Sequence, residues 1–179
     1  MYAQYPEKRY RLTLEFLQKH IDPGESILDL GVQNPFSELM AREGYQVHNT
    51  RGEDLDLSLQ AVQQTEANVV TAFEILEHMV APYNVLRAIP GQKLLASVPL
   101  RLWFASAYRS ESDPWDRHFH EFEAWQFDWL LEKAGWEIRD RLQWTHPVRK
   151  FGIRPILRTF TPRYYLVYAV RSSSMAQDG

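Results

Sequence analysis

Residues 26–36 read Ser-Ile-Leu-Asp-Leu-Gly-Val-Gln-Asn-Pro-Phe, and this segment constrains the fold more than any other part of the chain. A short apolar run delivers Asp29 and then Gly31 at the carboxyl end of a predicted strand. Nucleotide-type cofactor sites in open α/β sheets begin in this way, because a glycine lets the backbone approach the ligand closely. Gln33 and Pro35 stand where a tight phosphate or nucleoside loop would have glycine. The segment therefore predicts the fold directly and the ligand only conditionally.

Strands and helices alternate at short intervals along the rest of the chain. Strands are predicted at residues 26–30, 45–49, 68–73, 93–98, 136–144 and 164–170. Helices are predicted at residues 6–20, 35–42, 76–89 and 121–134, and residues 100–117 are predicted to be irregular. Asn34 is expected to cap the second helix, with Pro35 at its first position. The alternation predicts an α/β fold, a three-layer sandwich around a mostly parallel sheet.

Composition and length bound the class of protein. The 179 residues include six Trp, nine Tyr and nine Phe, which suits one folded domain with a sizeable core. Cysteine is absent, which excludes disulfides, thiolate metal sites and thiol catalysis. No segment has the apolar character of a signal peptide or a membrane span, so we expect a cytoplasmic protein. We predict that residues 1–171 form a single domain and that residues 172–179 form a disordered tail.

Charge is distributed unevenly along the chain. The formal net charge is -3, yet residues 139–171 hold eight basic residues and one acidic residue. The remainder holds twelve basic and twenty-two acidic residues. Such asymmetry fits an anionic partner near the C-terminal third, a basic surface on a homodimer, or a solvated basic face.

Four segments match a known family in order and spacing. They are residues 27–31 (Ile-Leu-Asp-Leu-Gly), residues 73–78 (Phe-Glu-Ile-Leu-Glu-His, followed by Pro82), residues 94–99 (Leu-Leu-Ala-Ser-Val-Pro) and residues 118–136, which begin His-Phe-His-Glu-Phe. Together they resemble the class I S-adenosylmethionine-dependent methyltransferases, in the small-molecule, type 11-like branch. The second and fourth segments are the specific part of this resemblance.

The resemblance implies a Rossmann-like methyltransferase fold and methyl transfer from S-adenosylmethionine to a small-molecule O or N acceptor. Carried over position by position, it assigns seven residues to the cofactor: Asp29, Gly31, Gln33, Arg51, Asp54, Phe73 and Glu74. The chain departs from the family at several of these positions, because only two residues of the Asp-x-Gly-x-Gly-x-Gly motif remain. The position of the acid that bonds the ribose hydroxyls in the family falls near Arg51, with Glu53 and Asp54 just beyond it. An alternative is therefore a catalytically silent methyltransferase-like module that binds a partner or another nucleotide.

His118 and His120 are the candidate catalytic residues. They alternate, so an extended segment would put both rings on one face, beyond the predicted strand at residues 93–98. A neutral imidazole can take a proton from an acceptor hydroxyl or amine. The competing interpretation is that both rings pack against Trp115 and Phe119. Glu77 and His78 do not form a His-Glu-x-x-His pattern, so no metal site is predicted.

Aromatic and basic residues are predicted to surround the substrate. Trp103, Phe104 and Trp115 are expected to wall the pocket and to offer aromatic faces to the cationic sulfonium. Residues 148–165 mix five basic residues with six large apolar ones, a mixture that could bind nucleic acid, an anionic membrane surface or a phosphorylated substrate. Pro155 and Pro162 are expected to break any long amphipathic helix there, and we favour a substrate cap or a dimer face over nucleic acid. We therefore expect a small-molecule substrate, and the basic residues favour one that carries an anionic group.

Overall fold

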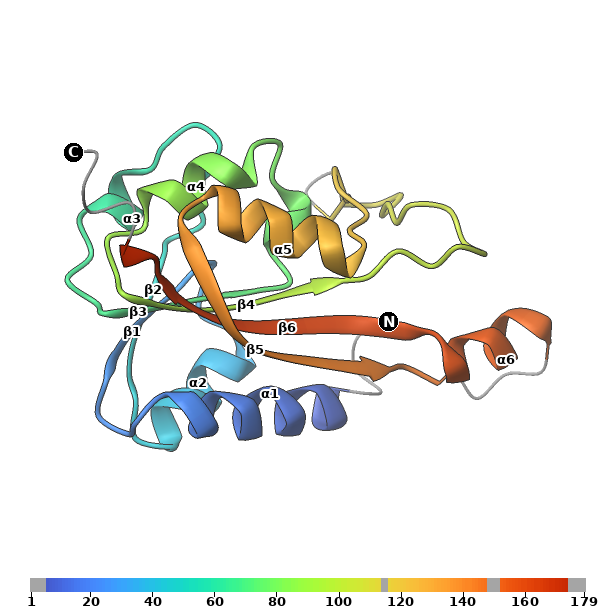
Figure 1. Cartoon of the computed structure of the whole chain (residues 1–179), viewed down its shortest axis with the longest axis horizontal. Coiled ribbons are helices and arrows are strands. Elements are labelled where there is room, and N and C mark those ends of the chain that lie inside the picture. The colour runs from blue at the N-terminus through green and yellow to red at the C-terminus, as the bar shows by residue number, and fades with distance from the viewer. Residues whose placement is uncertain (1–5, 114–115, 148–151, 174–179) are drawn as a thin grey trace.

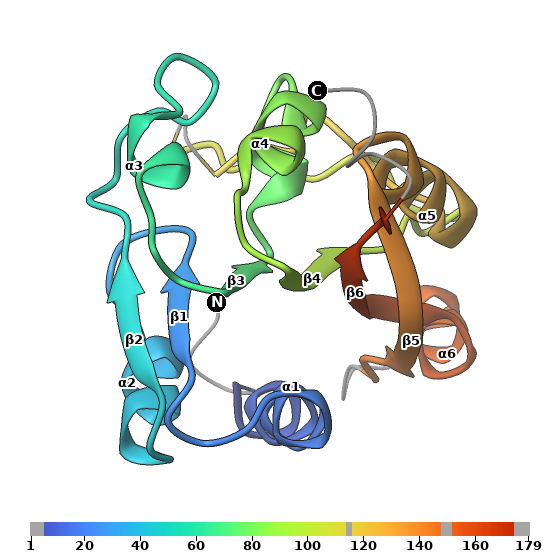
Figure 2. The same cartoon turned by 60° about the vertical axis from the view of Figure 1, so that its left-hand side comes forward.

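A six-stranded sheet runs through the molecule, with helices on both faces (Figures 1 and 2). The computed structural model describes residues 6–113, 116–147 and 152–173. In spatial order the strands are β2 (Gln46–Asn49), β1 (Ser26–Asp29), β3 (Val69–Phe73), β4 (Lys93–Pro99), β6 (Pro162–Arg171) and β5 (Trp136–Thr145). The first four strands pair in parallel, and β6 is antiparallel to both of its neighbours. The expected three-layer sandwich with a mostly parallel sheet is confirmed.

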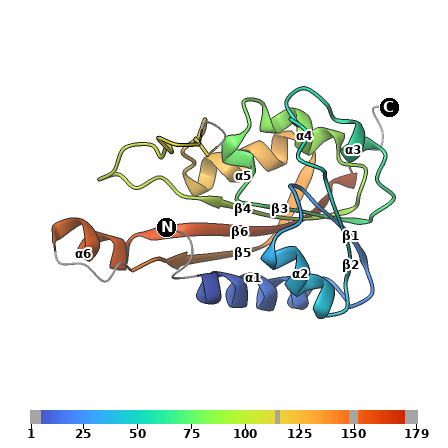
Figure 3. The same ribbon diagram turned by 180° about the vertical axis from the view of Figure 1, so that it is seen from behind.

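The helices divide between the two faces of the sheet. α1 (Pro6–His20) and α2 (Pro35–Arg42) cover one face. α3 (Gln60–Gln63), α4 (Pro82–Ala88) and α5 (Ala124–Lys133) cover the other (Figure 2). α6 (Ile153–Phe160) lies at the tip of the β5–β6 hairpin, beyond the end of the sheet (Figures 1 and 3). Among the described helices, none is long and apolar enough to cross a membrane.

Two predicted helices differ from the observed ones. The helix predicted at residues 76–89 is in fact a short 3-10 helix, η1 (Leu76–His78), followed by α4, which begins at Pro82. Proline disfavours a helical conformation in the residue before it, and the Asp56 carboxylate accepts the freed N–H groups of Val80 and Ala81 at 2.7 and 2.8 Å. The helix predicted from residue 121 begins at Ala124, where Glu123 and Gln126 form a capping box.

α6 was not predicted, because Pro155 was expected to interrupt a helix. The proline lies in the first turn of α6, where its missing N–H has no helical partner to lose. The predicted Asn34 cap, by contrast, is confirmed: its side-chain oxygen accepts from the N–H groups of Phe36 and Ser37. In the predicted tail, Ser172 donates its N–H to the carbonyl of Gly135 at 2.9 Å, and residues 174–179 lie outside the described residues.

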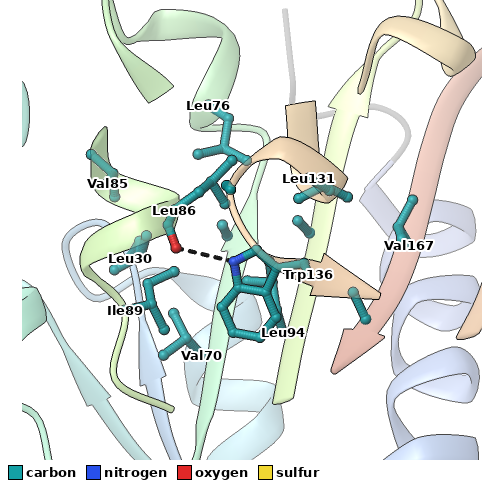
Figure 4. Packing of buried hydrophobic residues seen from close by; sticks show 14 of the residues in the cluster. Leu30, Val70, Leu76, Val85, Leu86, Ile89, Leu94, Leu131, Trp136 and Val167 are labelled. Atoms are coloured by element: carbon teal, nitrogen blue, oxygen red, sulfur yellow. Dashed lines mark hydrogen bonds between the residues drawn. The ribbon is translucent and has the colours of Figure 1, made fainter. Parts of the chain in front are cut away.

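Of the side chains that the structure describes, Trp136 is the largest that is fully buried, and it packs in the core between the sheet and helices α4 and α5 (Figure 4). Its Nε1–H donates to the carbonyl of Leu86, near the C-terminus of α4, at 3.0 Å. The Arg171 guanidinium lies over the indole ring, 3.9 Å from its centroid. The indole therefore supplies one of the partners that the last carbonyls of α4 lack within the helix.

We expect Trp136→Phe to lower the free energy of unfolding by about 1–3 kcal/mol, because the buried carbonyl of Leu86 loses its donor. Urea unfolding monitored by circular dichroism measures this change. Trp129→Phe is the matched control, since Trp129 is 57% exposed on α5 and its replacement should stay within about 0.5 kcal/mol. Equal losses in both variants would show that the Trp136 hydrogen bond does not hold α4 in place.

Candidate functional site

A cavity of about 350 Å³ opens at the carboxyl ends of β1, β3 and β4, and we call it the main cavity. Its residues come from the strand ends, from α1, from the start of α2, from η1, from the segment that follows β4 and from the first residues of β6. The polar residues among them are Arg9, Tyr10, Thr13, Asp29, Asn34, Glu74, Glu77, His78, Ser97, Tyr108, Asp116, His118, Arg163 and Tyr164. Ligands bind at this edge in open α/β sheets, because the loops that leave parallel strands converge there.

The Asp29 carboxyl ties together the elements at the base of the main cavity. Oδ1 accepts a hydrogen bond of 2.6 Å from the Thr71 hydroxyl on β3. Oδ2 accepts from the side-chain amides of Asn49 at 3.0 Å and Asn34 at 3.3 Å. Asn34 is also the cap of α2, so one carboxyl links β1, β2, β3 and the start of α2.

Burial dominates the protonation of Asp29. The residue is 3% exposed, and loss of hydration raises the pKa of its carboxyl to about 6, although the bonds from Thr71, Asn34 and Asn49 act in the opposite direction. No basic side chain is among the groups that act on it. At neutral pH the floor of the main cavity therefore carries a poorly hydrated negative charge.

Glu74 follows β3 in an unusual backbone conformation. With φ of 55°, it is the one non-glycine residue in the described chain with positive φ, a conformation that costs about 1–3 kcal/mol. Its Oε1 accepts from the Ser97 hydroxyl at 2.9 Å, and Arg9 Nη1 lies 3.9 Å from its Oε2. Burial raises the pKa of the Glu74 carboxyl, and Arg9 opposes that change. The strained backbone thus directs a carboxyl into the cavity opposite an arginine.

Glu77, on η1, connects the wall of the cavity to the segment after β4. Its carbonyl accepts from the N–H groups of Phe119 and His120 at 2.8 and 3.2 Å. Its side chain is buried, and burial raises the pKa of the carboxyl well above its ordinary value, with Glu74 adding to the effect. The adjacent His78 lies with its Nε2 3.6 Å from Glu77 Oε1.

The two candidate catalytic histidines lie in different surroundings. His118 lines the main cavity, and its Nδ1 lies 2.9 Å from Glu121 Oε1. Burial raises the pKa of Glu121, but the bonds from His118 and from the Tyr108 N–H outweigh it and lower that pKa. Glu121 is therefore ionised and accepts from His118 Nδ1–H. His120 stacks on Phe122 and lies 3.3 Å from the Val80 carbonyl, and it does not line the main cavity.

The residues assigned to the cofactor separate into two groups. Asp29, Phe73 and Glu74 line the main cavity. Gln33 and Arg51 line a separate surface depression between α2 and β2, where Gln33 Nε2 donates to Glu38 Oε1 at 3.3 Å. The Gln33 side chain therefore lies outside the main cavity, although it stands at a position where the motif has glycine. Arg51 is exposed, and its N–H donates to Glu53 Oε2.

Gly31 and Asp54 take part in local structure at the same edge. Gly31 has φ of 115°, and its N–H donates to the Thr50 hydroxyl at 2.7 Å. Its carbonyl accepts from the Asn49 amide at 3.3 Å. Asp54 accepts from the Asp56 N–H at 2.9 Å in the turn before α3. The backbone N–H and carbonyl of Gly31 are thus both bonded to side chains of the residues that follow β2 or end it.

The structure also changes the list of residues that surround the site. Trp103 and Phe104 pack edge to face, and neither lines the main cavity, so the expected wall is formed by Tyr108 and Asp116 instead. Trp115 lies outside the described residues. Arg9, Tyr10 and Thr13 of α1 were missed, because the amphipathic pattern of that helix marks only its packing face. The sequence marks Arg9 only as a basic residue on the helix before the first strand. Such residues are too common to identify one of them as part of a site.

The fold is shared with many solved structures, although no protein-family model and no curated protein sequence matches the chain. A SAM-dependent methyltransferase from Archaeoglobus fulgidus is 16% identical, with 96% of this chain and 100% of that chain covered and a TM-score of 0.56. The [4+2]-cyclase SpnF is also 16% identical, with 96% and 84% covered and a TM-score of 0.57.

A third structure, of Haemonchus contortus phosphoethanolamine N-methyltransferase 2 in complex with S-adenosyl-L-methionine, is 14% identical. The match covers 91% of this chain and 53% of that chain, and its TM-score is 0.57. The chain therefore has the class I methyltransferase-like fold that its sequence predicted, with strand order β2-β1-β3-β4-β6-β5 and an antiparallel hairpin at one end.

Asp29 should make stability depend on pH. The folded carboxyl keeps its proton up to about pH 6, whereas the unfolded one releases it near 3.8, so the free energy of unfolding should fall by about 3 kcal/mol as pH rises through this window. Glu74 and Glu77 act in the same direction, so the comparison is with Asp29→Asn, which keeps both. Urea unfolding from pH 4 to pH 8 should show a shallower decline in the variant. Parallel curves for the two proteins would contradict this assignment.

Proposed function

We propose that the protein transfers a methyl group from S-adenosylmethionine to an O or N atom of a small molecule bound in the main cavity. The observation that supports this most is the placement of Asp29, Phe73 and Glu74, three residues assigned to the cofactor, in one cavity with His118. These four residues come from three separate segments of the chain, and the fold brings them to the edge of the sheet where ligands bind.

The character of the cavity suits a cationic cofactor. The carboxyls of Asp29, Glu74 and Glu77 supply acidic groups, and the rings of Tyr10 and Tyr164 supply aromatic faces. A sulfonium or ammonium group is attracted to both kinds of surface. Because the sulfonium is already electrophilic, the protein needs mainly to align the acceptor with the methyl group and to exclude water.

His118 is the residue best placed to contact the acceptor. Its Nδ1–H donates to Glu121, which fixes the ring orientation and leaves a lone pair on Nε2 of the neutral imidazole. A proton leaving the acceptor hydroxyl or amine would pass to this nitrogen. His120 has no such route, because its ring is engaged with Val80 and Phe122 outside the cavity.

S-adenosylmethionine and S-adenosylhomocysteine should each stabilise the protein by about 2.7 kcal/mol at ~100 times the dissociation constant, which thermal unfolding detects. His118→Ala should keep this stabilisation and lose ~10²–10⁴-fold in turnover with a suitable acceptor, whereas His120→Ala should lose much less. No stabilisation of the native protein by either ligand at millimolar concentration would refute the proposal.

A second candidate is a methyltransferase-like protein that binds another nucleotide and transfers no methyl group. It is favoured by the environment of Gly31, whose N–H and carbonyl are already bonded to Thr50 and Asn49 and so are not left for S-adenosylmethionine. Arg51 also lies near the position where the family has an acid that meets the ribose, and a cation there would favour a phosphate. The [4+2]-cyclase among the fold neighbours performs a reaction other than methyl transfer on the same architecture.

Arg51→Asp separates the two candidates, because it moves the two affinities in opposite directions. Restoring an acid should raise the affinity for S-adenosylmethionine by ~10-fold, as a hydrogen bond to a charged group is worth about 1.5–3 kcal/mol. The same change should abolish binding of a phosphorylated nucleotide such as 2′-phospho-ADP-ribose. Isothermal titration calorimetry with both ligands measures the two affinities. Arg42→Asp, at an exposed position of α2, is the charge-matched control.

A further inference from the structure

Three potential metal ligands meet in one wall of the main cavity. Glu77 and His78 belong to η1, and His118 belongs to the segment after β4. One ligand atom from each residue lies within 4.8 Å of the other two. The rings of His78 and His118 contact edge to face, with 4.9 Å between their centroids. No sequence pattern marks this cluster, because the fold brings His118 to the Glu77–His78 pair from a distant segment.

The Glu77 carboxylate is an independent sign that something binds there. Its Oε2 has no hydrogen-bond partner in the part of the chain that the structure describes, although the residue is only 1% exposed. Buried polar atoms without a partner are rare in folded proteins, because such an atom loses its hydration and gains no hydrogen bond in return. The residue also lines the main cavity, from which a bound cation would be within reach.

Both histidines are held by their other nitrogen, as metal-binding histidines usually are. His78 Nδ1 donates to the Arg117 carbonyl at 3.0 Å, since a carbonyl oxygen can only accept. His118 Nδ1 donates to the Glu121 carboxylate at 2.9 Å. In a neutral imidazole this arrangement places the lone pair on Nε2. A backbone carbonyl and a carboxylate are the two usual partners that orient a histidine toward a metal.

We propose that Glu77, His78 and His118 bind a divalent transition-metal ion of the kind that imidazole prefers, with Zn²⁺ as the test ion. Two imidazoles and one carboxylate suit Zn²⁺ or a neighbouring first-row metal and do not suit Mg²⁺ or Ca²⁺, which take oxygen ligands. Bonds of about 2.0–2.1 Å would place ligand atoms about 3.3 Å apart. His78 Nε2 and Glu77 Oε1 already lie 3.6 Å apart, so side-chain rotations about existing bonds would complete the site.

Three protein ligands would leave a coordination position open to the cavity. That position could hold water or an oxygen of a bound molecule, as in catalytic zinc sites. In the proposed methyl transfer, and only if that proposal holds, the ion would orient an oxygen acceptor. His118 Nε2 accepts either a proton or the ion, so it is a base in the metal-free protein and a ligand in the loaded one.

The experiment uses the full chain after treatment with a chelator, with no S-adenosylmethionine present. Calorimetric titration with Zn²⁺ should give one ion per chain, and Co²⁺ in its place should give visible absorption bands of a nitrogen-ligated site. Glu77→Gln and His118→Ala should each weaken Zn²⁺ binding by at least ~100-fold, and Glu121→Gln by ~10-fold through the orientation of His118. His48→Ala, on an exposed residue of β2, is the matched control and should leave the affinity unchanged.

Two results would overturn the proposal. One is the absence of saturable Zn²⁺ binding to the native protein. The other is one-to-one binding that survives both Glu77→Gln and His118→Ala, which would place the ion elsewhere. Glu77→Gln preserves the shape of the side chain, so it keeps the test meaningful if His118→Ala does not fold. Thermal stabilisation by S-adenosylmethionine is measured separately on the metal-free protein, so failure of metal binding and failure of cofactor binding are distinguished.

Discussion

The hydrogen bonds to the buried Asp29 carboxyl are the interaction on which the rest of the site depends. Thr71 from β3, Asn49 from β2 and Asn34 from the start of α2 all donate to it. The three donors lie 5, 20 and 42 residues beyond Asp29 in the chain, and the carboxyl thereby fixes their elements at one edge of the sheet. The cost is a carboxyl whose hydration is lost, which is why its pKa rises to about 6 despite three donors. The base of the main cavity is thus both a structural junction and a chargeable surface.

Much of the fold could be predicted from the sequence, because it is encoded by local patterns. Asp29 and Gly31 mark the end of the first strand, and Asn34 with Pro35 marks the start of the next helix, all through backbone chemistry that acts within a few residues. The break between η1 and α4 was missed although Pro82 is a local signal for it. It is also supported by Asp56, a distant residue that accepts the N–H groups before Pro82. Local propensity at residues 76–89 cannot show such a contact.

The site was less predictable, since its parts are brought together only by the tertiary fold. Phe73 and Glu74 were recognised because they lie in a segment that resembles a known family, and the structure places both in the main cavity. Arg9 was missed because its partner is the Glu74 carboxyl at the end of β3. No residue near Arg9 in the sequence indicates that contact. The histidine pair was predicted from alternation alone, but only the structure shows that His118 faces the cavity while His120 packs outside it.

The departures from the family motif lie on one side of Asp29, and this bears on where a ligand would sit. Thr50 and Asn49 satisfy the backbone of Gly31, and Gln33 and Arg51 face a separate depression between α2 and β2. On the opposite side, α1 and the ends of β3 and β4 surround an open cavity with acidic, basic and aromatic groups. A ligand anchored at Asp29 would therefore make its polar contacts toward α1, Glu74 and His118. The positions at which the motif would have glycine therefore lie on the β1–β2 side, whereas the titratable groups of the main cavity lie on the β3–β4 side of the sheet.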